Sequence, residues 1–268
     1  MTNRAIPHEE AIEVRAFRDL FRSAPRSMID NGELAFQPIA EGCAVSLPFA
    51  PAIGLNRALG LKDIDSLETA LQWFAGRGGT RHLQISDDLV SRDVRDWIAD
   101  RGLERNPVSW VKLARSAPVF KMRWSGDIEV RPAASDEADM FGSLMCRGFG
   151  FAPELAPLWS AIVGETGWTC HLAWLDDRPV GSSIMYADGG YAWLGGGTTI
   201  AEYRNRGVQT ALISNRLNVG VEQGVSTFVV ETADPDAATS RVSFDNLVKA
   251  GFRPLYTRQN YLIVDEPT

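Results

Sequence analysis

Cysteine and histidine are scarce in this chain, which has three of each among 268 residues. Cys43, Cys146 and Cys170 lie far apart in segments of apolar character, and none belongs to a Cys-x-x-Cys pair. We therefore predict buried free thiols and no disulfide framework. No two histidines have the spacing of a ligand pair, so we expect no metal.

Long apolar runs are also missing. No segment approaches the roughly 20 apolar residues that a helix needs to cross a bilayer. The start of the chain has no apolar core of the kind found in signal peptides. These absences predict a cytoplasmic protein with no membrane partner.

Positive charge is in deficit, with 27 lysines and arginines against 34 acidic residues and a net charge of -7. A nucleic-acid-binding surface needs an excess of basic side chains, so we expect no nucleic-acid partner and favour amines instead. Hydrophobic residues make up 45% and charged residues 23% of the chain, which is enough to bury a sizeable core. The length is that of about two ordinary domains.

The segment from Ser116 to Asp127 contains proline and glycine, and its apolar residues recur with neither the helical nor the strand period. This composition is typical of a crossing between domains. We predict a first domain over residues 1–118, a linker over 119–127 and a second domain over 128–268.

In the second half, the spacing of apolar residues and the positions of turn residues predict an ordered series of helices and strands. Three successive strands predict an antiparallel meander, and the last two strands predict a hairpin that could mediate a homodimer. In chain order, we expect a strand over Ile128–Arg131, helices over Asp136–Phe149 and Pro153–Val163, strands over Thr169–Leu175, Pro179–Tyr186 and Tyr191–Gly197, a helix over Gly207–Gln223, a strand over Ser226–Glu231, a helix over Thr239–Ala250, and strands over Phe252–Tyr256 and Gln259–Val264.

The run from Thr198 to Ile213 places a strand end, a basic turn and a helix start in immediate succession. The first amides of a helix have no intrahelical acceptor and lie at the positive end of the dipole, so an anion placed there satisfies them. Arg204 and Arg206 add positive charge at the same end, and Gly207 allows a ligand to approach the backbone closely. The run predicts a phosphate-binding site.

This run, Arg204-x-x-Gly207-x-Gln209, resembles the acyl-CoA pyrophosphate loop of the GNAT N-acetyltransferase superfamily, whose motif is Arg/Gln-x-x-Gly-x-Gly/Ala. Gln209 replaces the final small residue. Its amide could donate to the pyrophosphate, which we favour, or its bulk could narrow the loop. The order of the predicted elements and the Gly251-Phe252 pair after the last helix also resemble the family.

The resemblance implies an α/β (α+β) fold with a mixed, mostly antiparallel sheet flanked by helices. It also implies acetyl-CoA as the acyl donor. The residues that it places against the cofactor are Thr198, Thr199, Ile200, Arg204, Asn205, Arg206, Gly207, Val208, Gln209, Thr210, Ser243 and Asn246.

The first half parallels the second. It predicts a helix over Leu67–Phe74, a strand over Arg81–Ile85, a helix over Leu89–Asp100 that is closed by Gly102, and a strand over Ser109–Leu113. We therefore expect two GNAT-like domains in tandem. The first lacks the phosphate loop before its helix, so we expect that it is degenerate and does not bind the cofactor.

In the family, acyl-CoA lies where two parallel strands splay apart, which here implies Tyr191–Gly197 and Ser226–Glu231. Glycines at 195–197 suggest clearance for the acyl group or the acceptor, or alternatively a bulge that serves packing. Phe149 or Trp159 could line an acceptor pocket, because both lie near the two helices that form the acceptor side in this family.

Glu231, at the end of the second of these strands, is the candidate general base, and the alternative is a carboxylate that caps the following turn. Leu247 and Ser240 stand where family members often carry the tyrosine acid and an asparagine. Tyr256 could replace the missing hydroxyl, or it could be a packing tyrosine.

These features favour an acyl-CoA-dependent N-acyltransferase that transfers acetyl to a primary amine, on a small molecule or a protein, by direct attack in a ternary complex. The alternatives are a non-catalytic acyl-CoA-binding or regulatory protein, and a purely structural interaction module. The basic helix start argues against the last of these.

Overall fold

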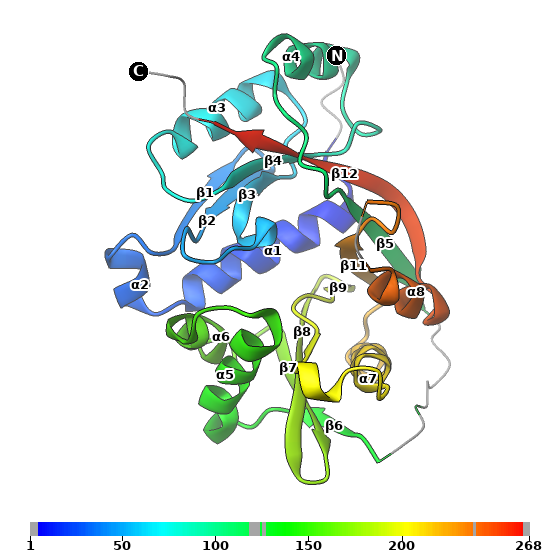
Figure 1. Cartoon of the computed structure of the whole chain (residues 1–268). Coiled ribbons are helices and arrows are strands. Elements are labelled where there is room, and N and C mark those ends of the chain that lie inside the picture. Colours follow the sequence, from blue (N-terminus) through cyan, green and yellow to red (C-terminus); the bar gives the residue numbers. More distant parts are fainter. Residues whose placement is uncertain (1–4, 118–123, 125–126, 238–239, 265–268) are drawn as a thin grey trace.

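The computed structural model describes residues 5–117, 124, 127–237 and 240–264 (Figure 1). Most of the predicted linker therefore lies outside the described residues. The helices are α1 His8–Ser23, α2 Arg26–Asp30, α3 Ile64–Phe74, α4 Arg92–Asp100, α5 Ala138–Phe149, α6 Ala156–Ser160, α7 Val208–Glu222 and α8 Val242–Lys249, with short 3-10 turns η1 Ile53–Leu55, η2 Ser135–Glu137, η3 Pro153–Leu155 and η4 Ala201–Tyr203. The strands are β1 Ala35–Ile39, β2 Gly42–Ser46, β3 Asn56–Leu59, β4 Arg81–Ile85, β5 Trp110–Ser116, β6 Glu129–Pro132, β7 Trp168–Leu175, β8 Arg178–Asp188, β9 Tyr191–Trp193, β10 Thr198–Thr199, β11 Thr227–Ala233 and β12 Arg253–Ile263.

One sheet runs through both halves of the molecule in the order β1-β2-β3-β4-β12-β5-β11-β9-β8-β7-β6, with β10 paired to β8. Only β3 with β4 and β9 with β11 pair in parallel among the described strands. The predicted mixed, mostly antiparallel sheet is confirmed, as is the β7-β8-β9 meander.

The two halves repeat one arrangement of elements. Each has a parallel strand pair, β3 with β4 or β9 with β11, whose members are connected through a helix, α3 or α7. Each then continues through a second helix and a glycine with positive φ, Gly102 (61°) or Gly251 (86°), into a final strand. The left-handed conformation at these glycines turns the chain back onto the sheet.

The final strands of the two halves are exchanged. β5 of the first half lies between β11 and β12 of the second half. The second part of β12, from Gln259 to Ile263, pairs with β4 of the first half. We propose that the chain divides near residues 118–128. Each half then contributes one strand, β5 or β12, that pairs with strands of the other half.

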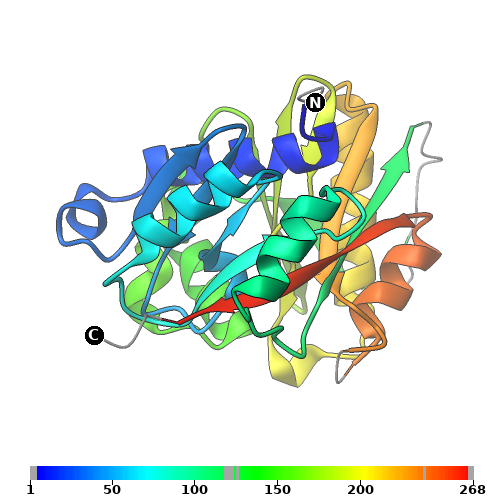
Figure 2. The same cartoon turned by 90° about the horizontal axis from the view of Figure 1, so that it is seen from above.

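The predicted C-terminal hairpin is wrong. Residues 253–263 form one strand, β12, which has β5 along its first part and β4 along its second. Figure 2 shows this strand crossing the whole molecule. Neighbouring strands fill the edges that a hairpin would expose, so the dimer surface that we placed on the hairpin is absent from the described structure.

Helices cover the sheet of the second half on both faces. α5 packs on one side of β8 with α6 against it, and α7 packs on the other side, against β7 and β8 (Figure 1). α7 starts at Val208, close to its predicted start, while the predicted helix from Leu89 starts only at Arg92, after its N-cap Ser91. The long α1, which the sequence analysis did not predict, packs against β9 of the second half and β2 of the first.

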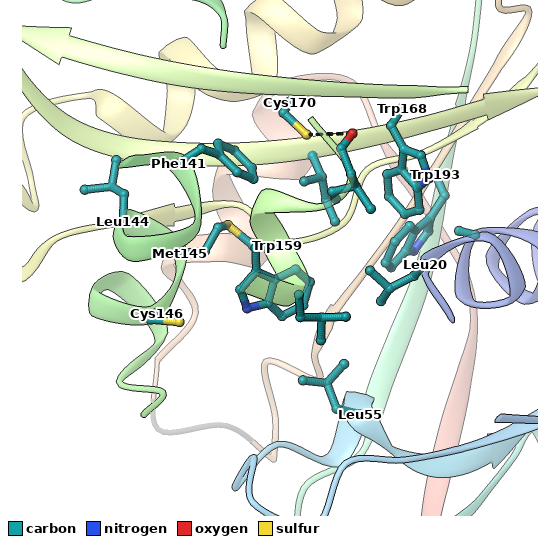
Figure 3. Close-up of a cluster of buried hydrophobic side chains, with 14 of the residues drawn as sticks. Leu20, Leu55, Phe141, Leu144, Met145, Cys146, Trp159, Trp168, Cys170 and Trp193 are labelled. Atoms are coloured by element: carbon teal, nitrogen blue, oxygen red, sulfur yellow. Dashed lines mark hydrogen bonds between the residues drawn. The ribbon is translucent and has the colours of Figure 1, made fainter. Parts of the chain in front are cut away.

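The largest core cluster joins both halves, with Leu20 and Leu55 of the first half beside Trp159 and Trp193 of the second (Figure 3). All three cysteines are buried and free, as predicted. None of the described helices has the length and apolar character to span a bilayer.

Candidate active site

The predicted phosphate loop lies at the start of α7. Gly207 is the N-cap residue at φ +85°, a conformation that favours glycine, and Asn205 precedes it at φ +62°. Gly207 has no side chain to cap the helix, and the first intrahelical bond is from Ala211 N–H to the Gly207 carbonyl at 2.9 Å. The amides of the first turn are therefore available to an anion.

A cavity of about 690 Å³, here called the loop cavity, opens at this helix start. All but two of the predicted cofactor-binding residues line it. The exceptions are Ile200, which is buried with its N–H bonded to the Val180 carbonyl, and Arg206, whose guanidinium lies 5.2 Å from the centre of the Tyr203 ring. The lining residues are Gly148, Phe149, Gly197, Thr198, Thr199, Tyr203, Arg204, Asn205, Gly207, Val208, Gln209, Thr210, Ser240, Val242, Ser243 and Asn246.

Gln209 connects α7 to α8. Its amide nitrogen donates to Ser243 Oγ at 3.0 Å, and its carbonyl oxygen accepts from Asn246 Nδ2 at 2.7 Å. The two bonds fix the side chain along one wall of the loop cavity. Its oxygen is engaged by Asn246, so only the second amide hydrogen is free to donate to a phosphate.

A second cavity of about 570 Å³, here called the inner cavity, shares Phe149, Gly197, Gln209 and Ser243 with the loop cavity. It lies where β9 and β11 separate. The last bond between these segments is from Leu194 N–H to the Val229 carbonyl at 2.8 Å, and the residues beyond it on both sides line the cavity. The splay that the resemblance implies is thus present at the predicted strands.

The glycines at 195–197 form one edge of this splay. A Cβ on Gly195 would lie 2.4 Å from the Trp193 ring, and one on Gly196, at φ +49°, would lie 2.7 Å from Met145 Cε. The rigid Trp193 ring therefore favours glycine at position 195, and the positive φ favours it at position 196, without reference to a ligand. No backbone amide of Gly195–Gly197 donates a hydrogen bond to the described part of the chain, which leaves these N–H groups beside the cavity.

Apolar and aromatic side chains from both halves make up most of the inner cavity. Phe149, Phe151 and Trp159 stack in series, with ring centres 5.3 and 6.3 Å apart. Sequence reasoning placed Phe149 and Trp159 near the acceptor side but missed the first-half residues, because no motif marks them. These are Phe17, Leu20, Pro51, Ala52, Ile53, Gly54, Leu55, Arg57, Val108 and Trp110.

Glu231 lies on the wall of the inner cavity, where β11 ends, and its side chain is 9% exposed. Its carboxylate accepts two hydrogen bonds from Arg57, at 2.8 and 3.2 Å, and also contacts Arg258. Oε1 accepts only from Arg57 among the described contacts, and a carboxylate oxygen has two acceptor sites, so one site on Oε1 is left for a proton.

These residues belong to a buried network of three acids and three bases, Glu10, Glu13, Glu231, Arg57, Lys112 and Arg258. Burial by itself would raise the pKa of Glu13, but the charges of Arg258, Lys112 and Arg57 hold that pKa well below its ordinary value. Burial and the charge of Arg258 lower the pKa of Lys112. The network is neutral as a whole and spans α1, β3, β5, β11 and β12.

Tyr256 is not brought to the cavities. Its hydroxyl donates to Glu10 Oε1 at 2.7 Å, and burial together with the charge of Glu10 raises its pKa. Leu247 does line the inner cavity, at the position where the resemblance places a tyrosine. Among the described residues, no group of three histidine, cysteine or acidic side chains is placed to hold a metal ion.

No protein-family model matches the sequence, and no curated protein matches it. Solved structures do resemble this one over almost its whole length. A GCN5-related N-acetyltransferase from Kribbella flavida is 13% identical with a TM-score of 0.62, and the match covers 98% of each chain. A tandem GNAT protein from the clavulanic acid biosynthesis pathway is 14% identical with a TM-score of 0.59, over 99% of this chain and 98% of that one. The chain has the GNAT fold, in its tandem arrangement.

A GNAT-family putative acetyltransferase from Novosphingobium aromaticivorans resembles the chain similarly, with 13% identity, a TM-score of 0.59 and coverage of 97% and 100%. These identities are low, so the likeness establishes the GNAT fold, as the loop motif and element order predicted. The chemistry has to be argued from the site.

The first GNAT-like half has its own cavity of about 660 Å³ beside the start of α3, which includes Lys62, Asp63 and Asp88 in its lining. Asp63 caps that helix, accepting the Ser66 N–H at 2.9 Å. The position that a phosphate would take is therefore filled by a carboxylate.

Proposed function

We propose that the protein is an acyl-CoA-dependent N-acyltransferase that transfers acetyl from acetyl-CoA to a primary amine. The observation that carries the proposal is the connection between the loop cavity at the start of α7 and the inner cavity at the splay. One cavity suits a pyrophosphate and the other an acceptor. Their junction at Gly197 is where a thioester and an amine would meet.

In the proposed reaction, the neutral amine attacks the thioester carbonyl, a C–N bond forms and the C–S bond breaks. The amine loses a proton, and CoA leaves as the thiolate, which takes up a proton after its release. Backbone N–H groups of Gly195–Gly197 are the available donors to the developing oxyanion, an interaction that contributes about 3 kcal/mol per donor in other acyl transfers. Holding the two reactants in line contributes more, roughly 7–11 kcal/mol.

Glu231 is the proposed acceptor of the amine's proton, directly or through water, because it is the one carboxylate among the residues that line the inner cavity. Tyr256 bonds Glu10 and does not line this cavity, so we no longer propose it as the acid. A thiol is acidic enough, with an ordinary pKa of about 8.5, for the thiolate to leave without a dedicated acid.

One observation favours a second candidate function. Leu247 stands on the cavity wall at the position of the family's usual acid, which is also what a protein that binds acyl-CoA without catalysis would show. We further propose that only the second half binds the cofactor, since Asp63 caps the equivalent helix of the first half.

Two measurements separate the candidates. Thermal unfolding with and without CoA tests binding, because a ligand at about 100 times its Kd stabilises the fold by roughly 2.7 kcal/mol. Thiol release from acetyl-CoA across a panel of primary amines tests transfer. Stabilisation together with amine-dependent thiol release supports the enzyme, stabilisation alone supports the binding protein, and absence of stabilisation contradicts both.

A further inference from the structure

Arg216 is a buried cation that has no role in the proposed reaction. It lies on α7, and only 3% of its surface is exposed. Its guanidinium donates to three backbone carbonyls, those of Leu212 at 3.2 Å, Ile184 at 3.2 Å and Gly195 at 3.1 Å. It forms no ion pair with any described acidic residue, although it lines the inner cavity.

Charge balance singles out Arg216 among the residues of this cavity. The other charged lining residues are Arg57 and Glu231, and both belong to the neutral network of three acids and three bases. The inner cavity therefore has one uncompensated positive charge in apolar surroundings. Burying a charge without a partner is costly, and a bound anion would remove that cost.

The neighbouring titratable group cannot compensate the charge of Arg216, because a histidine is either neutral or itself positive. His171 is fully buried, and burial together with the charge of Arg216 lowers its pKa to about 3, so it is neutral at physiological pH. Burial also lowers the pKa of Arg216 to about 9, which still leaves the guanidinium charged near neutrality.

The free part of the guanidinium faces the junction of the two cavities. A Cβ placed on Gly197 would lie 3.2 Å from Arg216 Nη2, and Gly197 lines both cavities. Nη1 is the atom that binds the carbonyls of Ile184 and Gly195. Nη2 is thus the donor left for a ligand that lies beside the splay.

We propose that the inner cavity binds a substrate carboxylate at Arg216, with an apolar or aromatic body against Phe17, Trp110 and Trp159. The inference rests on the proposed function, whose reaction brings substrates into this cavity. The carboxylate belongs either to the acceptor, as in an amino acid, or to the acyl group, as in a dicarboxylic acyl-CoA. Guanidinium and carboxylate form short, charge-assisted hydrogen bonds, which suits either source.

Binding can be tested without catalysis, so that failure of the proposed reaction does not affect the result. Calorimetry on the CoA-loaded protein compares phenylacetate with its neutral isostere 2-phenylacetamide. We expect phenylacetate to bind at least roughly tenfold more tightly, the usual effect of a hydrogen bond to a charged group. Arg216→Gln keeps an amide donor for the backbone carbonyls and should abolish that preference, while Arg216→Lys keeps part of it. Equal binding of the two probes by the wild-type protein, or a preference that survives in the glutamine variant, would overturn the proposal.

Turnover then identifies the source of the carboxylate. With acetyl-CoA, a kcat/KM higher for phenylalanine than for phenethylamine assigns it to the acceptor. With phenethylamine, a kcat/KM higher for malonyl-CoA than for acetyl-CoA assigns it to the acyl group. Either preference must disappear in Arg216→Gln, and a preference that persists there contradicts the assignment. CoA-induced stabilisation of the variant checks that its fold and cofactor site are intact.

Discussion

Arg57 and Glu231 face each other across the boundary between the two halves, 174 residues apart in sequence, with both carboxylate oxygens bonded to the guanidinium at 2.8 and 3.2 Å. Arg57 comes from β3 of the first half, and Glu231 comes from the splayed strand β11 of the second. Both side chains lie on the wall of the inner cavity. The first half therefore sets the surroundings of the carboxylate that we propose as the base, even though its own equivalent helix is capped by Asp63.

Replacing Arg57 with methionine should destabilise the fold strongly. The change leaves Glu13 and Glu231 with less positive charge in a buried site, and loss of one partner from such a pair costs about 3–5 kcal/mol. Chemical denaturation measures the free energy of unfolding. Arg92→Met is the matched control, because Arg92 and Asp96 form an exposed pair at 3.5 Å and its loss should leave the stability nearly unchanged. Equal, small effects of the two changes would show that the network does not hold the halves together.

Glu231→Gln should lower kcat/KM for the amine by roughly 100-fold at neutral pH if the carboxylate accepts the amine's proton. The loss should shrink at higher pH, where more of the acceptor amine is already neutral in solution. A pH profile of kcat/KM for the amine, recorded for both proteins, measures this. A loss of the same size at every pH would mean that Glu231 only holds Arg57 and Arg258 in place.

Arg204→Glu should abolish the rise in Tm that CoA produces, because it puts a negative charge beside the pyrophosphate at the start of α7. Arg178→Glu makes the same change of charge at the exposed first residue of β8, which lines neither cavity, and should keep the full shift. If the two variants respond to CoA alike, the loop has been assigned wrongly.

His171→Leu should flatten the fall in stability on mild acidification. The folded-state pKa of His171 is lowered to about 3 by burial and by Arg216, so below its ordinary value the unfolded chain binds a proton that the folded chain does not. Stability conferred by this group is present at neutral pH and falls with pH, by about 2 kcal/mol between pH 7 and pH 5. Burial lowers the pKa of His82 as well, so a smaller slope should remain in the variant. Denaturation at pH 7 and pH 5 measures the change in the free energy of unfolding. An equal change in the wild-type protein and the variant would show that His171 does not cause the pH dependence.

Much of the second half could be predicted from local sequence. The start of α7 follows from a glycine after a basic turn, and the meander follows from polar turns between alternating runs. The hairpin was predicted wrongly, because residues 257–258 look like a turn only until β5 and β4 are known to flank them. Helix α1 was missed, since its buried face includes Glu10 and Glu13, which periodicity treats as polar.

The sequence by itself determined the glycine turn at the start of α7 and the order of elements around it, because helix starts, turns and strand periods are set by neighbouring residues. It could not determine the inner cavity, the partners of Glu231 or the solitary charge of Arg216. Those depend on strands exchanged between the halves and on an α1 helix that lies hundreds of residues from β11 and β12 in sequence. Burial and charge balance are properties of that assembled arrangement, and no local pattern encodes them.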